Sequence, residues 1–316
     1  MSMTCMRRFA VNWIGDMDQI VGGLGLSGAG RVERIDAHHH LWRYSAAEYG
    51  WIDEEMAALR RDFLPGDLKD AMTSAGMDGT VAVQARQTMD ETRWLLDLAD
   101  ATDAGGSPIR GVVGWAPIAG EDFPGVMEEF DGRAKLKGLR HVIQDERDPH
   151  YILREDFNSG IRTMLDSGLV YEILIFERHL ADAITFVDEH PRQPFVLDHI
   201  AKPQIAAGQL EPWATNMREL GRRPNVCCKL SGMVTEADWR ADPAGARSLA
   251  TLKPYLDVAV EAFGPSRLMA GSDWPVCLLA TTYAQWFDLL RDYFAGFSEP
   301  ERAAIFGGTA IEVYGL

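Results

Sequence analysis

Short runs of β-branched and other apolar residues recur along the chain, and each is followed by a polar turn and a stretch with helical spacing. The runs are RIDAH (34–38), TVAVQ (80–84), GVVGW (111–115), GLRHVI (138–143), VYEIL (170–174), FVLDH (195–199), VCCKL (226–230) and LMAGS (268–272). Apolar runs of this length, bounded by turn residues, are typical of β-strands that are buried on both faces. The alternation predicts a succession of strand–helix units.

The predicted helices have recognisable ends. Thr88 and Glu91 have capping-box spacing at the start of one helix. In another, Phe157 and Met164 belong to an apolar face with helical spacing, and Gly168 follows as a stop signal. Helices that alternate with buried strands indicate a parallel sheet.

Eight strand–helix units without a linker or a break in composition favour an α/β fold, a single (β/α)8 TIM barrel over residues 33–316. A doubly wound parallel sheet is the alternative. That fold usually has fewer strands and a Gly-x-Gly-x-x-Gly turn after the first strand, and no such turn follows the first run here.

We predict that the first 32 residues form a flexible extension. The segment VGGLGLSGAGR holds so many glycines that ordering it into a helix or strand would cost much conformational entropy. A signal peptide is not predicted, since Asp16 and Asp18 interrupt the apolar stretch that follows two arginines. No run approaches the roughly 20 apolar residues of a membrane span.

Composition narrows the classes of partner and compartment. Lys and Arg number 31 against 47 Asp and Glu, so the net charge is −16, which repels nucleic acid and acidic membranes. The 4 cysteines include the adjacent pair Cys227 and Cys228 and do not suggest a disulfide framework. We expect a cytoplasmic protein that binds a small molecule and neither nucleic acid nor a membrane.

The first predicted strand ends in three consecutive histidines. Successive side chains of a strand point to opposite faces, so His38 and His40 share one face, together with Asp36, while His39 points the other way. The reactive groups of a TIM barrel gather at the carboxyl ends of its strands. His38 and His40 are therefore candidate site residues, and His39 is not.

Two further strand ends carry the same kind of chemistry. His199 ends the sixth run, and Asp273 follows the eighth. Three imidazoles and a carboxylate at one rim can hold a divalent metal, or act as acid, base and oxyanion stabiliser. We take His38, His40, His199 and Asp273 as candidates for both catalysis and metal binding.

Several ordered motifs carry a resemblance to a known family: IDAHHHLW, VQA, GLRHVIQDE, VLDHIAKP, KLSGM, GSDWPV and the closing AAIFGGTAIEVYGL. From about Arg34 to Leu316 the chain resembles the amidohydrolase-related group of the amidohydrolase superfamily. Within that group it is most similar to the sugar-lactone hydrolases of the L-fuconolactonase and L-rhamnonolactonase type. The resemblance implies a (β/α)8 barrel with His38, His40, His199 and Asp273 around the reacting centre.

In metal-dependent relatives these residues hold a divalent ion, commonly zinc. The bridging carboxylated lysine of the superfamily comes from strand four or five, where this chain has Arg140, His141, Tyr171 and Glu172 instead. A binuclear centre is therefore not expected. The lactonase branch also resembles proteins that work without an obligatory metal, so the resemblance implies one zinc ion or none.

The resemblance implies hydrolysis of a sugar lactone to the sugar acid. The three histidines, with or without zinc, would polarise the carbonyl, and Asp273 would deprotonate the attacking water. The substrate-binding candidates are the other strand-end residues: Gln84, Arg140, His141, Tyr171, Lys229 and Trp274.

Alternatives stay open at this stage. A 2-pyrone-4,6-dicarboxylate lactonase would need several Arg or Lys at the mouth, and a metal-dependent decarboxylase fits the same scaffold. A catalytically silent barrel that binds sugar acids is the alternative outside enzymes. A homo-oligomer is also open, because the aromatics from Trp286 to Phe294 could pack a second protomer or the chain's own barrel.

Overall fold

The computed structural model describes residues 31–101 and 107–316. Val32–Leu316 form one compact unit. The predicted flexible extension over residues 1–32 lies almost entirely outside the described residues, so it stays a prediction, as does the domain boundary at residue 33.

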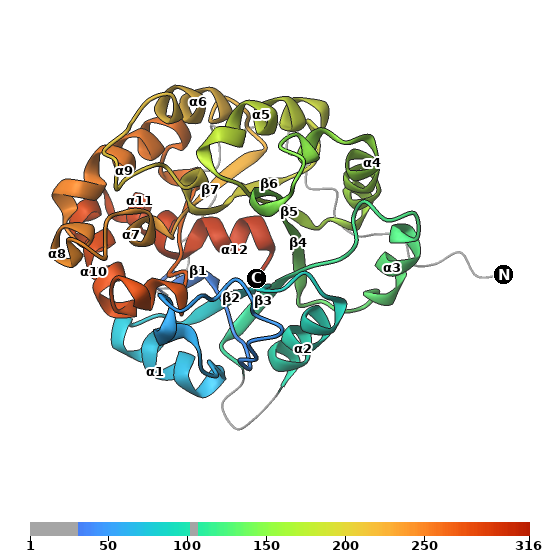
Figure 1. Cartoon of the computed structure of the whole chain (residues 1–316), viewed down its shortest axis with the longest axis horizontal. Helices are drawn as coiled ribbons and strands as arrows, with labels where there is room; N and C mark the ends of the chain where they lie inside the picture. The colour runs from blue at the N-terminus through green and yellow to red at the C-terminus, as the bar shows by residue number, and fades with distance from the viewer. Residues whose placement is uncertain (1–30, 102–106) are drawn as a thin grey trace. The chain divides into compact units, whose positions relative to one another are not determined.

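Eight parallel strands follow one another around the unit in chain order (Figure 1). They are β1 (Ile35–His39), β2 (Gly79–Val83), β3 (Ile109–Gly114), β4 (Leu136–Val142), β5 (Val170–Leu174), β6 (Phe195–Leu197), β7 (Val226–Leu230) and β8 (Leu268–Ala270). The last strand returns to the first through backbone hydrogen bonds from Asp273 N to His38 O (2.8 Å) and from His40 N to Trp274 O (2.6 Å). The prediction of a (β/α)8 barrel is confirmed, and the doubly wound alternative is wrong.

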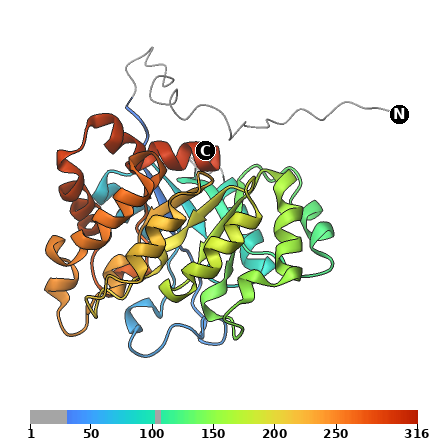
Figure 2. The ribbon, with the colours of Figure 1, turned by 90° about the horizontal axis from the view of Figure 1, so that it is seen from above.

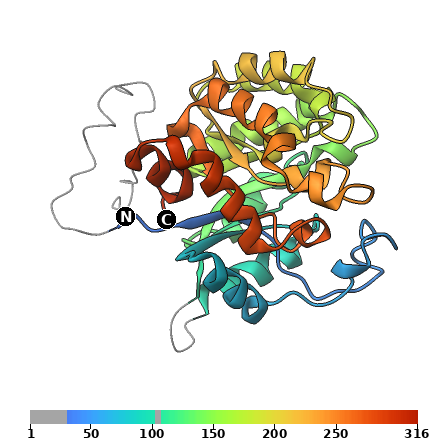
Figure 3. The ribbon, with the colours of Figure 1, turned by 90° about the vertical axis from the view of Figure 1, so that its left-hand side faces the viewer.

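Helices surround the strands. Their bounds are α1 (Pro65–Ala75), α2 (Met89–Asp100), α3 (Phe123–Glu129), α4 (Glu155–Met164), α5 (Leu180–Glu189), α6 (Trp213–Leu220), α7 (Met233–Glu236), α8 (Pro243–Ala246), α9 (Leu249–Phe263), α10 (Tyr283–Tyr293), α11 (Glu299–Ala303) and α12 (Thr309–Tyr314). Figures 2 and 3 show the red helix α12 at the end of the barrel opposite to the blue loop that follows β1. The mouth is therefore the end that carries this loop.

The predicted helix ends are largely confirmed. Thr88 Oγ1 accepts from the backbone N–H of Glu91 at the start of α2. The Glu91 carboxylate turns away to accept from the backbone N–H groups of Ala85 and Arg86, so the capping box is only half formed. Gly168 ends the α4 segment with φ +72°.

The barrel interior contains an apolar cluster. It consists of Ile35, Ala37, Val81, Val83, Val113, Val170, Val196, Cys227 and Met269, together with Ala310 and Tyr314 of α12. A larger apolar cluster fills the layer between strands and helices and contains Trp286, Phe287 and Phe294. Those C-terminal aromatics therefore pack within their own chain, and they carry no argument for a second protomer.

A bulge changes the side-chain alternation in β1. Between Asp36 and His39, β1 uses three residues where β2 uses two. Asp36 consequently turns toward the helix layer and accepts hydrogen bonds from Tyr283 of α10 (3.0 Å) and from Ser272. The prediction that Asp36 shares the face of His38 is wrong, because a bulge resets the period of two. His39 does point away from the site, toward Thr80 Oγ1 (3.0 Å).

No helix in the described part of the chain is long and apolar enough to cross a membrane. Within the same residues Cys227, Cys228 and Cys277 are free thiols. The cytoplasmic location, the oligomeric state and the exclusion of nucleic acid stay predictions.

Candidate active site

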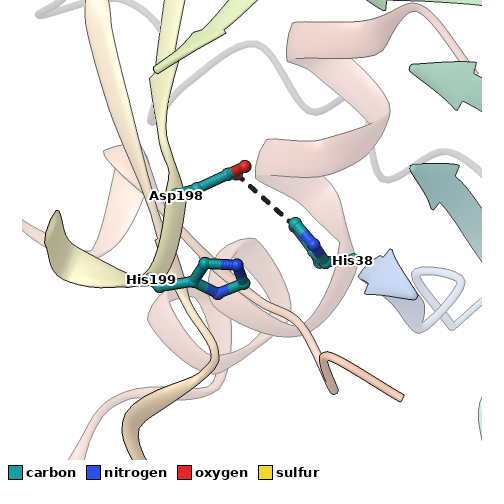
Figure 4. A group of neighbouring side chains, drawn as sticks. All are labelled: His38, Asp198 and His199. Carbon is teal, nitrogen blue, oxygen red and sulfur yellow. Dashed lines mark ion pairs between the residues drawn. The ribbon is translucent and has the colours of Figure 1, made fainter. Parts of the chain in front are cut away.

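Four of the predicted residues meet at the carboxyl ends of the strands. His38 Nε2 lies 3.2 Å from His40 Nε2, and His40 Nε2 lies 3.3 Å from Asp273 Oδ1. Asp273 Oδ1 is also 3.8 Å from His38 Nε2 and 4.0 Å from His199 Nε2. Figure 4 shows His199 and Asp198 beside His38. The structure thus brings the predicted imidazoles and carboxylate together.

The orientations of two imidazoles are set by the nitrogen that faces away from the cluster. His40 Nδ1 lies 2.8 Å from the backbone oxygen of Val83, a contact that requires Nδ1 to donate. His40 Nε2 is therefore the nitrogen that faces Asp273 Oδ1, 3.3 Å away. His199 Nδ1 lies 2.9 Å from Ser231 Oγ, which turns its Nε2 toward the same carboxylate. Burial lowers the pKa of His199 to about 4, so its imidazole is neutral near pH 7.

Unusual backbone conformations support this geometry. His199, Ile200, Ala201 and Lys202 all have φ between +47° and +59°, and Asp273 has φ +55°. Non-glycine residues in this region store strain that the surrounding structure must hold, and such positions cluster at functional sites. The backbone is thus bent at the two strand ends where a site residue must point into the mouth.

His199 packs directly against the backbone of Gly232, which leaves no room for a larger side chain there. A Cβ at Gly232, which has φ +67° and ψ −2°, would lie 2.7 Å from His199 Nδ1, whereas a Cβ at Gly168, which has φ +72° and ψ 11°, would meet no atom within 4 Å. We expect Gly232→Ala to lower kcat by about 10- to 100-fold, because the imidazole is displaced by a large fraction of an ångström. Gly168→Ala carries similar backbone strain and should leave kcat within about twofold. Steady-state rates of both variants on a hydrolysed lactone decide this, and equal losses in the two would contradict it.

A network of buried charges lies beneath the histidines. Arg140 Nη1 donates to Asp198 Oδ2 (2.9 Å), and Lys229 Nζ donates to Glu172 Oε1 (2.6 Å) and lies 3.2 Å from Asp198 Oδ1. Tyr314 of α12 donates to the same Glu172 oxygen from the closed end of the barrel. Each of these side chains is almost or fully excluded from solvent.

This network fixes the charges around His38. Lys229 Nζ lies 3.2 Å from His38 Nδ1, Asp198 Oδ1 lies 3.4 Å from it, and Arg140 Nη1 lies 3.4 Å from His38 Nε2. Burial and Lys229 hold the pKa of His38 well below its usual range. Burial opposes ionisation of Asp198, yet Lys229, His38 and Arg140 hold the pKa of its carboxyl well below the usual range. Burial raises the pKa of Glu172 to about 7, so Asp198 is the permanent anion of the pair.

A cavity of about 970 Å³ opens over this cluster. Its floor includes His40, Arg140, His199 and Asp273. Its walls are Glu48, Gly50, Trp51, Met56, Ala85, Arg86, Gln87, Thr88, Val142, Gln144, Asp145, Leu174, Phe176, Lys202, Thr235, Glu236, Trp239, Arg240, Val276 and Leu279. The cavity combines aromatic faces with polar groups of both signs, which suits a polar ring compound.

Several predicted substrate-binding residues do not line this cavity. His141 stacks on Tyr151 (ring centroids 4.9 Å apart), and Tyr171 packs among aromatic rings of the helix layer. Both orientations follow from the alternation of side chains along a strand. Arg140 and Glu172 point inward, so the adjacent His141 and Tyr171 point outward. The expectation that His141 and Tyr171 face the mouth is therefore wrong.

The other predicted residues that do not line the cavity lie behind its floor. Lys229 is fully buried beneath His38, and Trp274 packs edge-on against Phe63 (5.2 Å). Gln84 and Arg140 are joined through each other's backbone oxygens, so Gln84 braces the guanidinium. Of the six predicted substrate-binding residues, only Arg140 lines the cavity.

Two kinds of residue at the site had no predicted role. Asp198 immediately precedes His199 and lies at a strand end, a signal that would have supported its inclusion. Glu236 and Trp239 line the cavity from the segment after β7, and no periodic pattern marks that segment. They come from a helix of only 4 residues, α7, and from the loop that follows it.

The donor set fits a single divalent cation. His40 Nε2 and Asp273 Oδ1 face each other at 3.3 Å, and when both are deprotonated they are two acceptors that need a proton or a cation between them. With bonds of about 2.0–2.1 Å, a tetrahedral zinc ion separates its ligands by about 3.3 Å. The His38, His40 and Asp273 atoms lie 3.2, 3.3 and 3.8 Å apart. His38, Asp198 and His199 form a second group with ligand spacing, but it shares His38 with the first.

Comparisons with known proteins identify similar sequences and a similar fold. A family model described as amidohydrolase matches residues 35–316. A protein of Burkholderia multivorans named L-fucono-1,5-lactonase is 42% identical over 290 residues, which cover 90% of this chain and 96% of that protein. A protein of the same name from Burkholderia ambifaria is 37% identical, with 89% and 95% covered. The crystal structure of an amidohydrolase from Burkholderia multivorans with bound zinc is 41% identical and superposes with a TM-score of 0.82 over 90% of this chain and 99% of that one.

Proposed function

The chain belongs to the amidohydrolase family, and on this premise we propose that it hydrolyses a neutral sugar lactone to the sugar acid at the mouth of its barrel. The observation that carries the proposal is the Asp273 carboxylate, which lines an open cavity within 4.0 Å of three imidazole nitrogens. Burial opposes ionisation of Asp273, yet His199 and His40 hold its pKa below the usual range, so it is ionised and able to accept a proton.

Hydrolysis assigns one task to each group of the floor. Asp273 accepts a proton from water as the water oxygen bonds to the lactone carbonyl carbon. Arg140, the cation of the floor, stabilises the negative charge that develops on the carbonyl oxygen, together with the imidazoles. The bond from the acyl carbon to the ring oxygen then breaks, and the proton held by Asp273 passes to that oxygen. The product is a hydroxy acid.

We propose that His38, His40 and Asp273 hold one zinc ion, with His199 beside it. When bound, a divalent cation polarises a carbonyl oxygen and lowers the pKa of water. The chain's own residues orient this donor set, since Val83 fixes the His40 ring and Ser231 fixes the His199 ring.

Zinc titration distinguishes two neighbouring histidines. We expect the protein to bind about one zinc ion per chain, and His40→Asn to weaken that binding by about 100-fold or more, because it removes a ligand. The matched control is His39→Asn in the same tripeptide, whose ring bonds Thr80 on the opposite face. Competition with a chromophoric chelator measures both affinities. Equal weakening in the two variants, or two ions of similar affinity, would contradict the assignment.

The charges of the cavity favour a neutral substrate. Of the cations that line it, Arg86 pairs with Glu48 (2.6 Å), Arg240 pairs with Glu55 (2.8 Å) and Arg140 pairs with Asp198 (2.9 Å). Only Lys202 has no ion pair within the described residues. A dicarboxylate would need two such unpaired cations or more. We therefore place a neutral aldonolactone ahead of a pyrone dicarboxylate.

A panel of substrates tests the proposal. We expect the purified protein to release acid from L-fucono-, L-rhamnono- or related aldonolactones well above the spontaneous rate, as followed by a pH indicator. Preference for 2-pyrone-4,6-dicarboxylate, or release of carbon dioxide from a carboxylated substrate, would replace the proposal with one of the alternative enzymes. Sugar-acid binding without hydrolysis of any lactone would indicate the silent barrel.

A further inference from the structure

Glu236 is an acidic residue of the cavity wall whose carboxylate has no partner among the described residues. It ends α7, and its backbone oxygen accepts from Ala206 N (2.9 Å), which fixes the end of the helix. Its carboxylate makes no hydrogen bond or ion pair with any residue in the described ranges 31–101 and 107–316. By contrast Glu48, on the same cavity, is held by Arg86 at 2.6 Å. Glu236 is thus available to a ligand, and Glu48 is not.

Lys202 offers the complementary charge. It follows His199 in the left-handed segment and lines the same cavity, with its Nζ 5.3 Å from the centre of the Phe176 ring. Burial raises the pKa of Glu236, and the positive charge of Lys202 works against that rise, so the two side chains lie within electrostatic range of each other. The wall above His199 therefore carries one unpaired acceptor group and one unpaired donor group.

The chemistry of a sugar ring matches this pair. A carboxylate accepts hydrogen bonds through both oxygens and can receive the hydroxyl groups of two adjacent ring carbons. An ammonium group donates to hydroxyl oxygens. An anionic substrate would be repelled by Glu236 as well as by Asp273, and an apolar ring would leave both charges without partners. The wall thus selects for a neutral ring that carries hydroxyl groups.

We propose that Glu236 and Lys202 recognise the ring hydroxyl groups of the lactone, with Glu236 accepting from adjacent hydroxyls. This inference rests on the proposed lactone hydrolysis and adds to it the residues that bind the hydroxylated part of the substrate. The pair acts on recognition and takes no part in proton transfer at the carbonyl. Its contribution therefore exists only for substrates that carry hydroxyl groups.

Two lactones separate recognition from chemistry. The first is the best aldonolactone of the panel, and the second is δ-valerolactone, which has the ester ring and no hydroxyl groups. Glu236→Gln keeps the shape and removes the charge, and we expect it to lower kcat/KM for the aldonolactone by about 10- to 100-fold. For δ-valerolactone the change should stay within about threefold. Lys202→Met should change the ratio of the two kcat/KM values in the same direction.

Glu48→Gln is the matched control, because Glu48 lines the same cavity but is already paired with Arg86. We expect it to leave the ratio of kcat/KM for the two lactones within about threefold. An equal loss on both lactones in Glu236→Gln, or no loss on either, would overturn the inference while the activity of the parent protein stands. A parent protein that hydrolyses no lactone would overturn the proposed function and this inference with it.

Discussion

Replacing Asp273 by asparagine is expected to lower kcat for lactone hydrolysis by about a thousandfold, within the range of roughly 10² to 10⁴ typical of a lost general base. Asparagine keeps the size and shape of the side chain and cannot accept the proton from water. Asp273 is only 5% exposed and contacts His40, so no other base can easily take its place. Steady-state rates on the best aldonolactone measure the effect.

The control for this variant is Asp145→Asn. Asp145 lines the same cavity and is exposed at its rim, so its loss changes the charge of the mouth by the same amount without touching the floor. We expect it to retain kcat within about threefold. If Asp273→Asn, shown to be folded by its thermal transition, kept more than a tenth of the parent rate, Asp273 would not be the base.

The second large effect concerns stability. Lys229→Met is expected to lower the free energy of unfolding by about 3–5 kcal/mol, because it leaves two buried carboxyl groups without their amine. Lys229 is fully buried between Glu172 and Asp198, and no water can replace it there without a rearrangement. Such a loss corresponds to a fall of about 10 °C in the midpoint of thermal unfolding. Calorimetry measures it.

An exposed lysine gives the comparison. Lys253 makes a similarly short ion pair with Asp257 (2.7 Å), but 56% of its side chain is exposed, and Lys253→Met should cost about 1 kcal/mol or less. The double variant Lys229→Met/Glu172→Gln should recover part of the loss, because one of the stranded carboxyl groups is gone. Equal costs for the two lysine variants would show that the buried network contributes little to stability.

Much of the fold could be predicted from the pattern of apolar runs. VYEIL and VCCKL coincide with β5 and β7, and the other runs overlap their strands, because strands buried on both faces are mostly apolar along their length. The barrel then followed from the count, and the mouth from the rule that reactive groups gather at the carboxyl ends of strands. For the same reason His38, His40, His199 and Asp273 were predicted to lie close together, and they do.

The wrong predictions about individual side chains came from features of the barrel that the positions of the strand ends do not reveal. Arg140 and His141 are neighbours, yet alternation sends only one of them inward, and the phase of each strand is not written in its composition. The bulge in β1 moved Asp36 to the opposite face. Lys229 points inward but lies too deep to reach a ligand, since depth depends on the stagger of neighbouring strands. Glu236 lies on a helix of 4 residues, which is too short to show a hydrophobic periodicity in the sequence.

Hydrolysis of an aldonolactone in water labelled with oxygen-18, followed by mass spectrometry of the product, tests most directly whether Asp273 activates water. We expect the parent protein to accelerate the reaction and to place one labelled oxygen in the new carboxylate, and we expect Asp273→Asn to do so about a thousandfold more slowly. Label on the hydroxyl carbon of the opened ring, or product formation no faster than in buffer alone, would contradict this expectation.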